Sequence, residues 1–241
     1  MDTSSCPVVL IPGFMLDESL WDDFRNHLPE NWVVVNASLS GGQTISEIAR
    51  HIAEHAPERF LLIGFSLGGY IARQLAADYP ERVGALVIVA SSLREDTEQQ
   101  TKLKQQAINA LSDARFKGLS NSTIANSLHP HRAADTDLIS RIKQMGNRLG
   151  YKALAIQSVL DRSGVPTETI ACPTLVVAST SDALRSLDEA QELVRAIPNA
   201  SLQIIDDAGH MIPLERPREL AATIVHWLGS QRIHHADIEC K

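Results

Sequence analysis

The chain has 241 residues, of which 44% are apolar, and it carries a formal net charge of −7. This length and apolar content are typical of one globular domain with room for an inserted subdomain, and they exclude a disordered chain. An acidic balance without a basic run argues against nucleic acid as a partner, and no apolar run is long enough to span a bilayer.

Short β-rich runs alternate along the chain with helical stretches. Six predicted strands are continuously apolar and span residues 8–11, 32–35, 60–63, 85–90, 174–178 and 202–205. Continuous apolar character is typical of strands that helices cover on both faces. Strand, helix and strand in succession predict an α/β fold with a mostly parallel sheet of about six strands and right-handed crossovers.

The helices between these strands have readable ends, and they are predicted over residues 44–56, 70–79 and 213–227. The first begins with a capping-box pattern at Thr44 and Glu47. The last begins between Pro213 and Pro217, since proline is favoured in the first helical turn. The tail, residues 231–241, is polar without a clear period, and we expect no packed element there.

The segment from residue 92 to 163 breaks this alternation because it contains no strand signal. Apolar residues recur there at helical spacing in three groups, which are Leu103, Ala107, Ala110 and Leu111, then Leu138, Ile142 and Met145, then Leu154, Ile156 and Leu160. Three or four inserted helices are predicted, placed over the strand ends as a lid. The expected core therefore comprises residues 1–91 and 164–230.

The three cysteines, Cys6, Cys172 and Cys240, lie far apart and form no Cys-x-x-Cys pair. The pattern predicts neither a zinc site nor a disulfide framework, and free thiols in a reducing cytoplasm are the expectation. We expect Cys172, just before a strand, to be a small buried apolar residue. Before the first apolar run there is an acid and no base, which is not typical of a secretion signal.

Five residues, Gly64-Phe65-Ser66-Leu67-Gly68, stand between an apolar strand and an amphipathic helix. Gly-x-Ser-x-Gly in this context is the pattern of a nucleophile elbow, a turn so tight that its flanking residues must be small. Ser66 would lie at a helix N-terminus, whose partial positive charge favours a developing anion. The motif therefore predicts a nucleophilic serine.

A serine nucleophile needs a base and an orienting acid. His210 follows the last predicted strand, and Asp182 follows the strand before it. Ligand sites in parallel sheets form outside the carboxyl ends of the strands, where all three residues are expected. Ser66, Asp182 and His210 also occur in the chain order serine, acid, histidine.

Alternatives to these assignments remain open. Asp207 is a rival acid because it lies so close to His210 in the sequence, and Glu95 and Asp96 are further candidates because they follow an earlier strand. Asp182 would then only cap a helix. His129 and His131 resemble a metal-binding tract, but no carboxylate or cysteine accompanies them locally, which favours a solvated loop.

On these motifs the chain resembles the α/β-hydrolase superfamily, specifically a small carboxylesterase-like member with a helical lid. The resemblance covers residues 7–227 and includes Gly209-His210 followed by Glu215-x-Pro217. Pro12-Gly13-Phe14 matches the place of the family's second oxyanion donor. The resemblance implies that the backbone N–H groups of Phe14 and Leu67 form the oxyanion hole.

The chain also departs from the pattern of this superfamily. Many relatives carry a histidine where Pro12 stands, and Ser179 replaces the usual glycine of the acid loop. Relatives often begin with an antiparallel hairpin, but only six residues precede Pro7, so we expect a shortened sheet that begins at the oxyanion strand.

The function predicted is a serine hydrolase that cleaves small, largely apolar carboxylic esters through an acyl-enzyme, with no cofactor or metal. A pocket between the elbow, the Phe14-Met15-Leu16 loop and the lid is expected to be apolar. The same apparatus serves lactones, thioesters and carbon–carbon bond cleavage, and an acyltransferase or a slow-turnover small-molecule receptor are further alternatives. The sequence does not indicate the oligomeric state.

Overall fold

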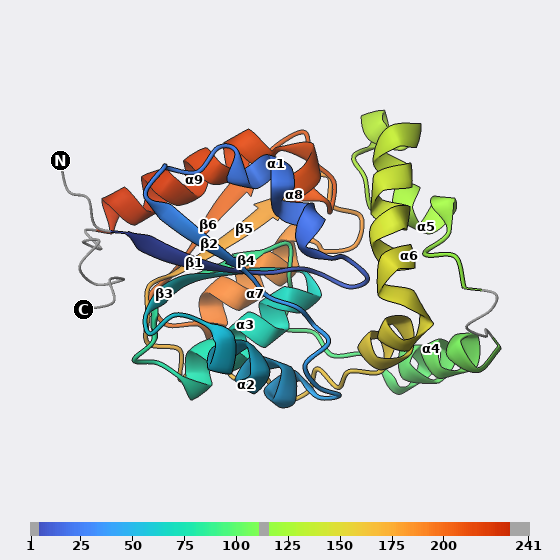
Figure 1. Ribbon diagram of the computed structural model, residues 1–241, viewed down its shortest axis with the longest axis horizontal. Helices are drawn as coiled ribbons and strands as arrows, with labels where there is room; N and C mark the ends of the chain where they lie inside the picture. The colour runs from blue at the N-terminus through green and yellow to red at the C-terminus, as the bar shows by residue number, and fades with distance from the viewer. Residues whose placement is uncertain (1–4, 111–115, 232–241) are drawn as a thin grey trace.

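The computed structural model describes residues 5–110 and 116–231 (Figure 1). Its centre is one sheet of six strands, β1 (Cys6–Ile11), β2 (Trp32–Asn36), β3 (Phe60–Phe65), β4 (Val83–Val89), β5 (Thr174–Ser179) and β6 (Ala200–Ile205). Every strand pair is parallel. The predicted shortened parallel sheet, beginning at the strand before Pro12, is confirmed.

Helices cover both faces of the sheet (Figure 1). One face carries α1 (Asp22–Arg25), α8 (Ile212–Glu215) and α9 (Pro217–Ser230), together with the short 3-10 helix η1 (Glu18–Trp21). The other face carries α2 (Ile45–His55), α3 (Leu67–Asp78) and α7 (Leu187–Ala196). The α7 helix was not predicted, although Ser186 and Glu189 form a capping box at its beginning.

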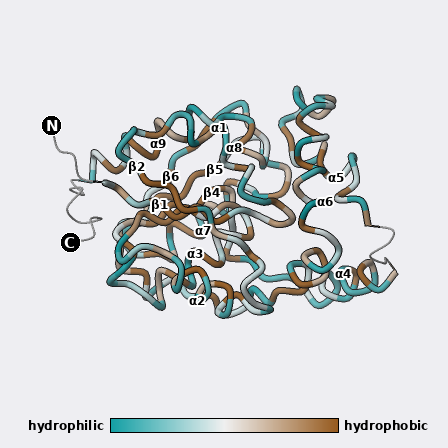
Figure 2. Tube along the Cα trace, in the orientation of Figure 1, coloured by the Kyte–Doolittle hydropathy of each residue, from teal (hydrophilic) through white to brown (hydrophobic). Residues whose placement is uncertain are grey.

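Alternate residues of each strand enter two different cores. In β1, Val8 and Leu10 pack with Trp21 and the α9 side, and Val9 and Ile11 pack with the α2 and α3 side. Because both faces of the central strands β1 and β3 are buried, these strands read as continuous apolar runs, whereas the edge strands β2 and β6 are partly exposed. Figure 2 shows this apolar centre inside more polar outer helices.

The strand order is β2-β1-β3-β4-β5-β6. The chain therefore leaves β1 for the edge, returns to β3 on the other side of β1, and then continues outward in one direction. The order reverses between β1 and β3, and ligand sites of parallel sheets form at such a reversal. The loop with Phe14 follows β1 and Ser66 follows β3, so both lie at this point.

Between β4 and β5 the chain forms α4 (Glu98–Ala110), α5 (Asn121–Ala125), the 3-10 helix η3 (Pro130–Arg132) and α6 (Thr136–Ser158). These helices lie beyond one end of the sheet (Figure 1). No strand occurs within the described part of residues 92–163, as predicted. The long α6 is kinked at Gly150, whose φ of 79° is not helical.

The first apolar group of this insert does not form a buried face. Leu103 is 57% exposed, Ala107 and Ala110 are also exposed, and Ile108 is the buried residue of α4. The prediction missed this because a few apolar residues at helical spacing do not decide which face packs. Leu111, from the same group, lies outside the described residues.

Leu138, Ile142 and Met145, the second apolar group, are buried, and Leu160 of the third group is buried as well. Of the tail, only residue 231 falls within the described residues, and Cys240 lies outside them. Within residues 5–110 and 116–231, no helix is both long and apolar enough to cross a membrane.

Candidate active site

Ser66 sits in a strained turn between β3 and α3. Its φ of 52° and ψ of −112° are unusual for a residue with a side chain. The turn is held because Ser66 N–H donates to Val89 O (2.9 Å) and Ser91 Oγ donates to Ser66 O (2.8 Å). The strand, turn and helix around Ser66 are the context that a nucleophile elbow requires.

The flanking glycines leave no room for a side chain. A Cβ on Gly64 would lie 2.5 Å from Gly68 O and 2.7 Å from the Ala72 Cβ. Gly64→Ala is therefore expected to lower the free energy of unfolding by about 1–3 kcal/mol, as overpacking does. Urea unfolding measures this loss, with Gly229→Ala as the control, since no atom lies within 4 Å of that Cβ. Equal stability of the two variants would contradict the steric argument.

The structure brings Ser66, His210 and Asp182 together in one hydrogen-bonded chain. His210 Nε2 lies 2.9 Å from Ser66 Oγ, and His210 Nδ1 lies 2.8 Å from Asp182 Oδ2. A carboxylate only accepts, so Nδ1 carries the proton and Nε2 accepts from the serine hydroxyl. The side chains of His210 and Asp182 are 5% and 1% exposed, which shields these bonds from competing water.

Backbone N–H groups hold the Asp182 carboxylate in its orientation. Its Oδ1 accepts from Leu184 N–H (2.8 Å) and Arg185 N–H (2.9 Å), which leaves Oδ2 for the imidazole. Ser179, which stands where relatives carry glycine, donates from Oγ to Ala208 O and so joins the acid loop to the histidine loop.

The rival acids do not contact the imidazole. The Asp207 side chain is 73% exposed and pairs with Arg216 at 3.3 Å. Asp96 pairs with Lys104 at 2.6 Å, and Glu95 is exposed. Of the four carboxylates considered from the sequence, Asp182 alone bonds His210.

The loop after β1 brings Phe14 beside the elbow. A Cβ on Gly13 would lie 3.2 Å from the Ser66 Cβ, so this loop passes close to the serine. Among the bonds of the described residues, the N–H groups of Phe14 and Leu67 have no acceptor. Met15, at a positive φ of 55°, donates its N–H to Gln157 Oε1 (2.8 Å). No sequence pattern indicates this support from Gln157, which lies 142 positions away.

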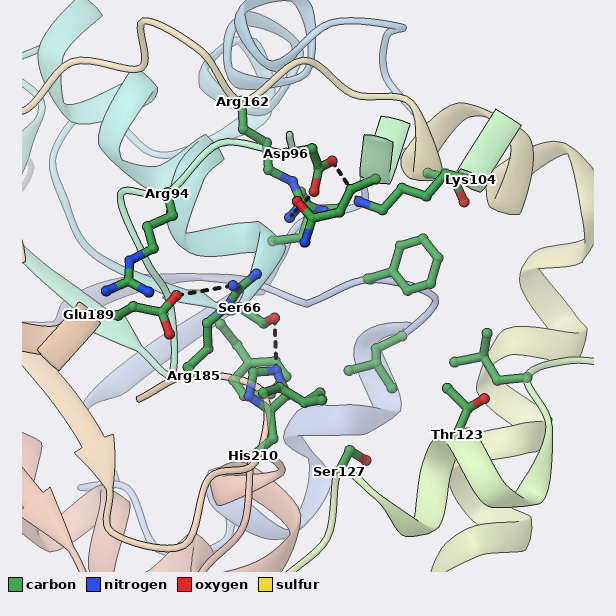
Figure 3. A pocket seen from close by; sticks show the side chains of 18 of the residues that line it. Ser66, Arg94, Asp96, Lys104, Thr123, Ser127, Arg162, Arg185, Glu189 and His210 are labelled. Atoms are coloured by element: carbon green, nitrogen blue, oxygen red, sulfur yellow. Dashed lines mark hydrogen bonds and ion pairs between the residues drawn. The ribbon is translucent and has the colours of Figure 1, made fainter. Parts of the chain in front are cut away.

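A cavity of about 750 Å³ opens at the serine. Its apolar lining comes from Phe14, Leu16, Leu119, Ile124 and Met211, together with Phe65, Leu67 and Leu184. The expectation of an apolar pocket is nevertheless wrong in part, because charged side chains also line it, namely Arg94, Glu95, Asp96, Lys104, Arg162, Arg185 and Glu189. These charges escaped prediction because they come from segments far apart in the sequence. Figure 3 shows Asp96, Lys104 and Arg162 gathered on one side of Ser66.

The sequence matches a known protein family over most of its length. A sequence model of the alpha/beta hydrolase fold family matches residues 45–217. The chain belongs to the alpha/beta hydrolase fold family.

Curated relatives of this alpha/beta hydrolase are similar over a shorter stretch. It is 34% identical over 96 residues to the pimeloyl-[acyl-carrier protein] methyl ester esterase of Citrobacter koseri, and 35% identical over 96 residues to the protein of that name from Salmonella heidelberg. Each match covers 36% of this chain and 38% of the relative. The matched region thus spans well under half the length of these relatives.

Solved structures of the same fold match nearly the whole chain. An esterase from Thermogutta terrifontis superposes with a TM-score of 0.77 at 22% identity, over 96% of this chain and 91% of its own. An enol-lactonase from Burkholderia xenovorans LB400 superposes with a TM-score of 0.81 at 18% identity, over 93% and 92% of the two chains. These likenesses show that the alpha/beta hydrolase fold extends beyond the family match.

Glu215 of this alpha/beta hydrolase is buried behind the histidine loop. One carboxylate oxygen accepts from Gly209 N–H (2.9 Å), and the other accepts from His129 N–H (2.8 Å). His210 N–H also donates across to Ser127 O (2.8 Å). Glu215 therefore ties the loop that carries His210 to the helical insert, and His129 belongs to this connection rather than to a free solvated loop.

We expect Glu215→Gln to lower the free energy of unfolding by about 1–3 kcal/mol, because the amide NH2 would face one of two buried N–H donors. Urea unfolding measures the loss. Glu219→Gln is the matched control, since Glu219 is 54% exposed and only 3.9 Å from its partner Arg216. An equal effect of both substitutions would contradict the buried role of Glu215.

The Glu215 carboxylate makes the stability of the fold depend on pH. Burial raises the pKa of Glu215 above its ordinary value of 4.5, against the lowering effect of the two backbone bonds. The folded protein therefore holds the proton more tightly than the unfolded chain, and this contribution to stability is lost as the pH rises from 4.5 through the raised pKa. The stability advantage of the wild type over Glu215→Gln should accordingly be larger in mild acid than at neutral pH.

Other reactive groups of the fold lie away from the serine. Burial raises the pKa of the Cys6 thiol to about 12 and of the Cys172 thiol to about 11, so neither is a nucleophile at neutral pH. Cys172 is partly rather than fully buried. In the described ranges, one group of three side chains could hold a metal ion, His51, Glu54 and His55 on α2, and none of them lines the cavity.

Proposed function

We propose that this chain is a serine hydrolase that cleaves carboxylic esters through an acyl-enzyme on Ser66. The observation that supports it is the chain of hydrogen bonds from Ser66 Oγ through His210 to Asp182, at 2.9 and 2.8 Å, next to a cavity large enough for a small substrate. The family's hydrolase fold and the ester-cleaving relatives agree with this chemistry.

In the first step His210 Nε2 takes the proton of Ser66 while Oγ attacks the ester carbonyl carbon. Asp182 keeps the proton of His210 on Nδ1 and stabilises the imidazolium that forms. The negative charge that develops on the carbonyl oxygen is met by the N–H groups of Phe14 and Leu67, and one such donor is worth about 2.7–4 kcal/mol of barrier.

In the following steps the imidazolium gives its proton to the departing alkoxide, and the alcohol leaves. Water enters, His210 takes a proton from it, and the resulting hydroxide attacks the acyl carbon. The second tetrahedral species collapses with release of the carboxylic acid and return of the proton to Ser66. Each step uses only protein groups and water.

The helical insert, residues 92–163, acts in this proposal as a lid over the serine. Leu119, Thr123, Ile124 and Ser127 from the insert line the cavity, which supports this role. Closing such a segment over the substrate excludes bulk water and orders the acyl group.

The curated relatives are named for cleavage of a methyl ester, which favours small alkyl esters over bulky ones as the alcohol part. Hydrolysis of a chain-length series of p-nitrophenyl esters tests the function and sizes the cavity. We expect turnover that saturates with ester and depends on Ser66. Covalent labelling without repeated turnover would instead favour a receptor, and product formation only with an added alcohol would favour an acyltransferase.

A further inference from the structure

Two arginines of the cavity keep buried N–H groups without an acceptor. The Nε atoms of Arg162 and Arg185 are buried, and neither has a hydrogen-bond partner within the described residues. The Arg162 side chain is only 11% exposed, although it lines the cavity. Buried donors of this kind are costly when they stay unpaired, and other atoms of both arginines line the cavity in which the proposed substrate binds.

Cationic and acidic side chains lie side by side in the lining of the cavity. Four cationic side chains, Arg94, Lys104, Arg162 and Arg185, face three acidic ones, Glu95, Asp96 and Glu189. Glu192, outside this lining, pairs with Arg94 at 2.8 Å, so Lys104, Arg162 and Arg185 are the cations that remain for a ligand.

The existing ion pairs do not occupy these cations fully. Asp96 is shared, since Lys104 approaches it to 2.6 Å and Arg162 only to 3.7 Å. Arg185 donates a single hydrogen bond to Glu189, from Nη1 to Oε1 at 3.2 Å. Burial lowers the pKa of Lys104, and the nearby positive charges of Arg162 and Arg185 lower this pKa as well, as expected where cations gather.

Packing against Tyr70 orders the Arg162 side chain within the cavity lining. Its guanidinium lies 5.4 Å from the centre of the Tyr70 ring, and the Tyr70 hydroxyl donates to Arg94 O (2.7 Å). A stacked guanidinium keeps its edge free for hydrogen bonds in the ring plane. Because the Arg162 side chain is already ordered, little conformational entropy is lost when an anion binds to it.

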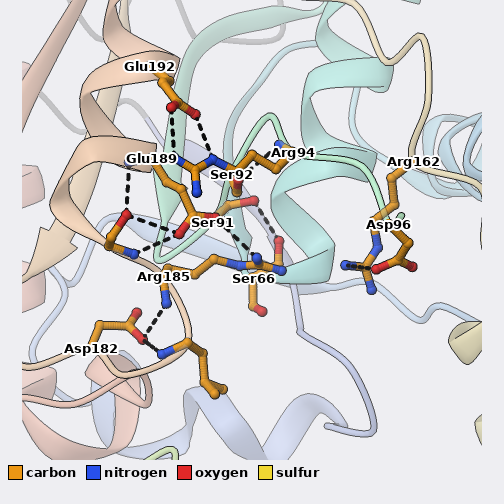
Figure 4. Close-up of polar contacts among 12 residues, drawn as sticks. Ser66, Ser91, Ser92, Arg94, Asp96, Arg162, Asp182, Arg185, Glu189 and Glu192 are labelled. Atoms are coloured by element: carbon orange, nitrogen blue, oxygen red, sulfur yellow. Dashed lines mark hydrogen bonds and ion pairs between the residues drawn. The ribbon is translucent and has the colours of Figure 1, made fainter. Parts of the chain in front are cut away.

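The cationic groups lie within reach of a substrate on the serine. Arg185 follows the acid loop, and both Figure 3 and Figure 4 show its side chain extending toward Ser66. In Figure 3, Arg162 and Lys104 lie beyond it on the same side, opposite Thr123 and Ser127. One wall of the cavity thus holds these cations together with Asp96, whereas Phe14, Leu119 and Ile124 supply apolar lining.

We propose that the cavity selects esters that carry a free carboxylate, held by Arg162, Lys104 and Arg185 while the ester carbonyl lies on Ser66. This inference rests on the proposed serine hydrolase function and adds the substrate class to it. The apolar lining receives the hydrocarbon part of the molecule. A planar carboxylate suits the paired donors of a guanidinium, and its single negative charge is repelled less by the acidic side chains of the lining than a phosphate dianion would be.

The test compares matched esters that differ only in a terminal carboxylate. One pair varies the acyl part, mono-p-nitrophenyl adipate against p-nitrophenyl hexanoate. A second pair varies the alcohol part, the hexanoyl ester of glycolate against ethyl hexanoate. We expect the wild type to prefer the carboxylate ester in at least one pair by about 10- to 100-fold in kcat/KM, the range for hydrogen bonds to a charged group.

Arg162→Gln and Lys104→Gln should each reduce that preference at least severalfold, and the preference should weaken with added salt. Arg132→Gln is the matched control, since Arg132 belongs to the same insert, pairs with Asp135 at 2.8 Å and does not line the cavity. Lys104, whose side chain is 32% exposed, provides a variant that should fold even if the loss of Arg162 unfolds the protein.

The possible outcomes distinguish a failure of this substrate class from a failure of the proposed serine hydrolase function. Ser66-dependent hydrolysis of the neutral esters without preference for the carboxylate in either pair would overturn the substrate class and leave the hydrolase standing. A preference that survives both substitutions would overturn the assigned residues. Stronger binding of inorganic phosphate than of adipate, read as competitive inhibition, would overturn the choice of a carboxylate. No hydrolysis of any ester would count against the proposed function itself.

Discussion

Ser66→Ala is expected to lower kcat for p-nitrophenyl esters by about 10⁶-fold, the loss seen when a triad serine is removed from a serine protease. In the proposed mechanism the substitution removes the atom that forms the acyl bond, Ser66 Oγ, which lies 2.9 Å from His210 Nε2. In the variant, a water molecule activated by His210 would have to attack the ester instead. This water reacts more slowly because no covalent bond to the protein holds it in position.

The fold should survive this change. Alanine faces the same positive φ as the serine, so the strain of the turn is unchanged, and the bonds of the Ser66 backbone to Val89 and Ser91 remain. The loss of one partly buried hydrogen bond costs about 1 kcal/mol. Urea unfolding and kcat are measured together, with the exposed Ser140→Ala as control. Activity of Ser66→Ala near that of the wild type would remove the serine from the mechanism.

Asp182→Asn should lower kcat by about 10⁴-fold, more than any other single change of a carboxylate in the chain. Asp182 Oδ1 accepts two backbone N–H groups, from Leu184 and Arg185, which an asparagine keeps only if its carbonyl oxygen takes that place. The NH2 group then faces His210 Nδ1 at the position of Oδ2. Nδ1 must become the acceptor, so the proton moves to Nε2 and the imidazole can no longer accept from Ser66.

The comparison with Asp207→Asn makes this prediction specific. Asp207 neighbours the histidine loop in sequence, but its side chain is 73% exposed and pairs with Arg216. We expect its replacement to change kcat by less than about twofold, as a surface pair is worth little. A larger loss for Asp207→Asn than for Asp182→Asn, measured with the same ester, would transfer the orienting role to Asp207.

The fold was largely predictable because its signals are local. Residues 60–63 are apolar at every position since both faces of β3 are buried, and the capping residue Thr44 accepts from Glu47 N–H as its pattern indicates. Where the local signal was weak, prediction failed. The apolar spacing of Leu103 and Ala107 indicated a helix correctly but not its exposed face.

For the candidate site, sequence pattern alone was enough to predict the residue types and their order at the strand ends, Ser66, Asp182 and His210, because a parallel sheet carries such ends to one edge. The tertiary structure decided which carboxylate meets the imidazole, Asp182 rather than Asp207, because orientation depends on backbone donors that the sequence does not display.

Folding also places Gln157 behind the Met15 backbone and Glu215 between two loops, which no local pattern predicted. It likewise places Arg162 and Lys104 in one cavity with Ser66. These side chains lie on segments far apart along the chain, and their polar groups find partners only after the sheet and the insert have packed. Local pattern thus determines where the chemistry can occur, whereas long-range packing decides what surrounds it.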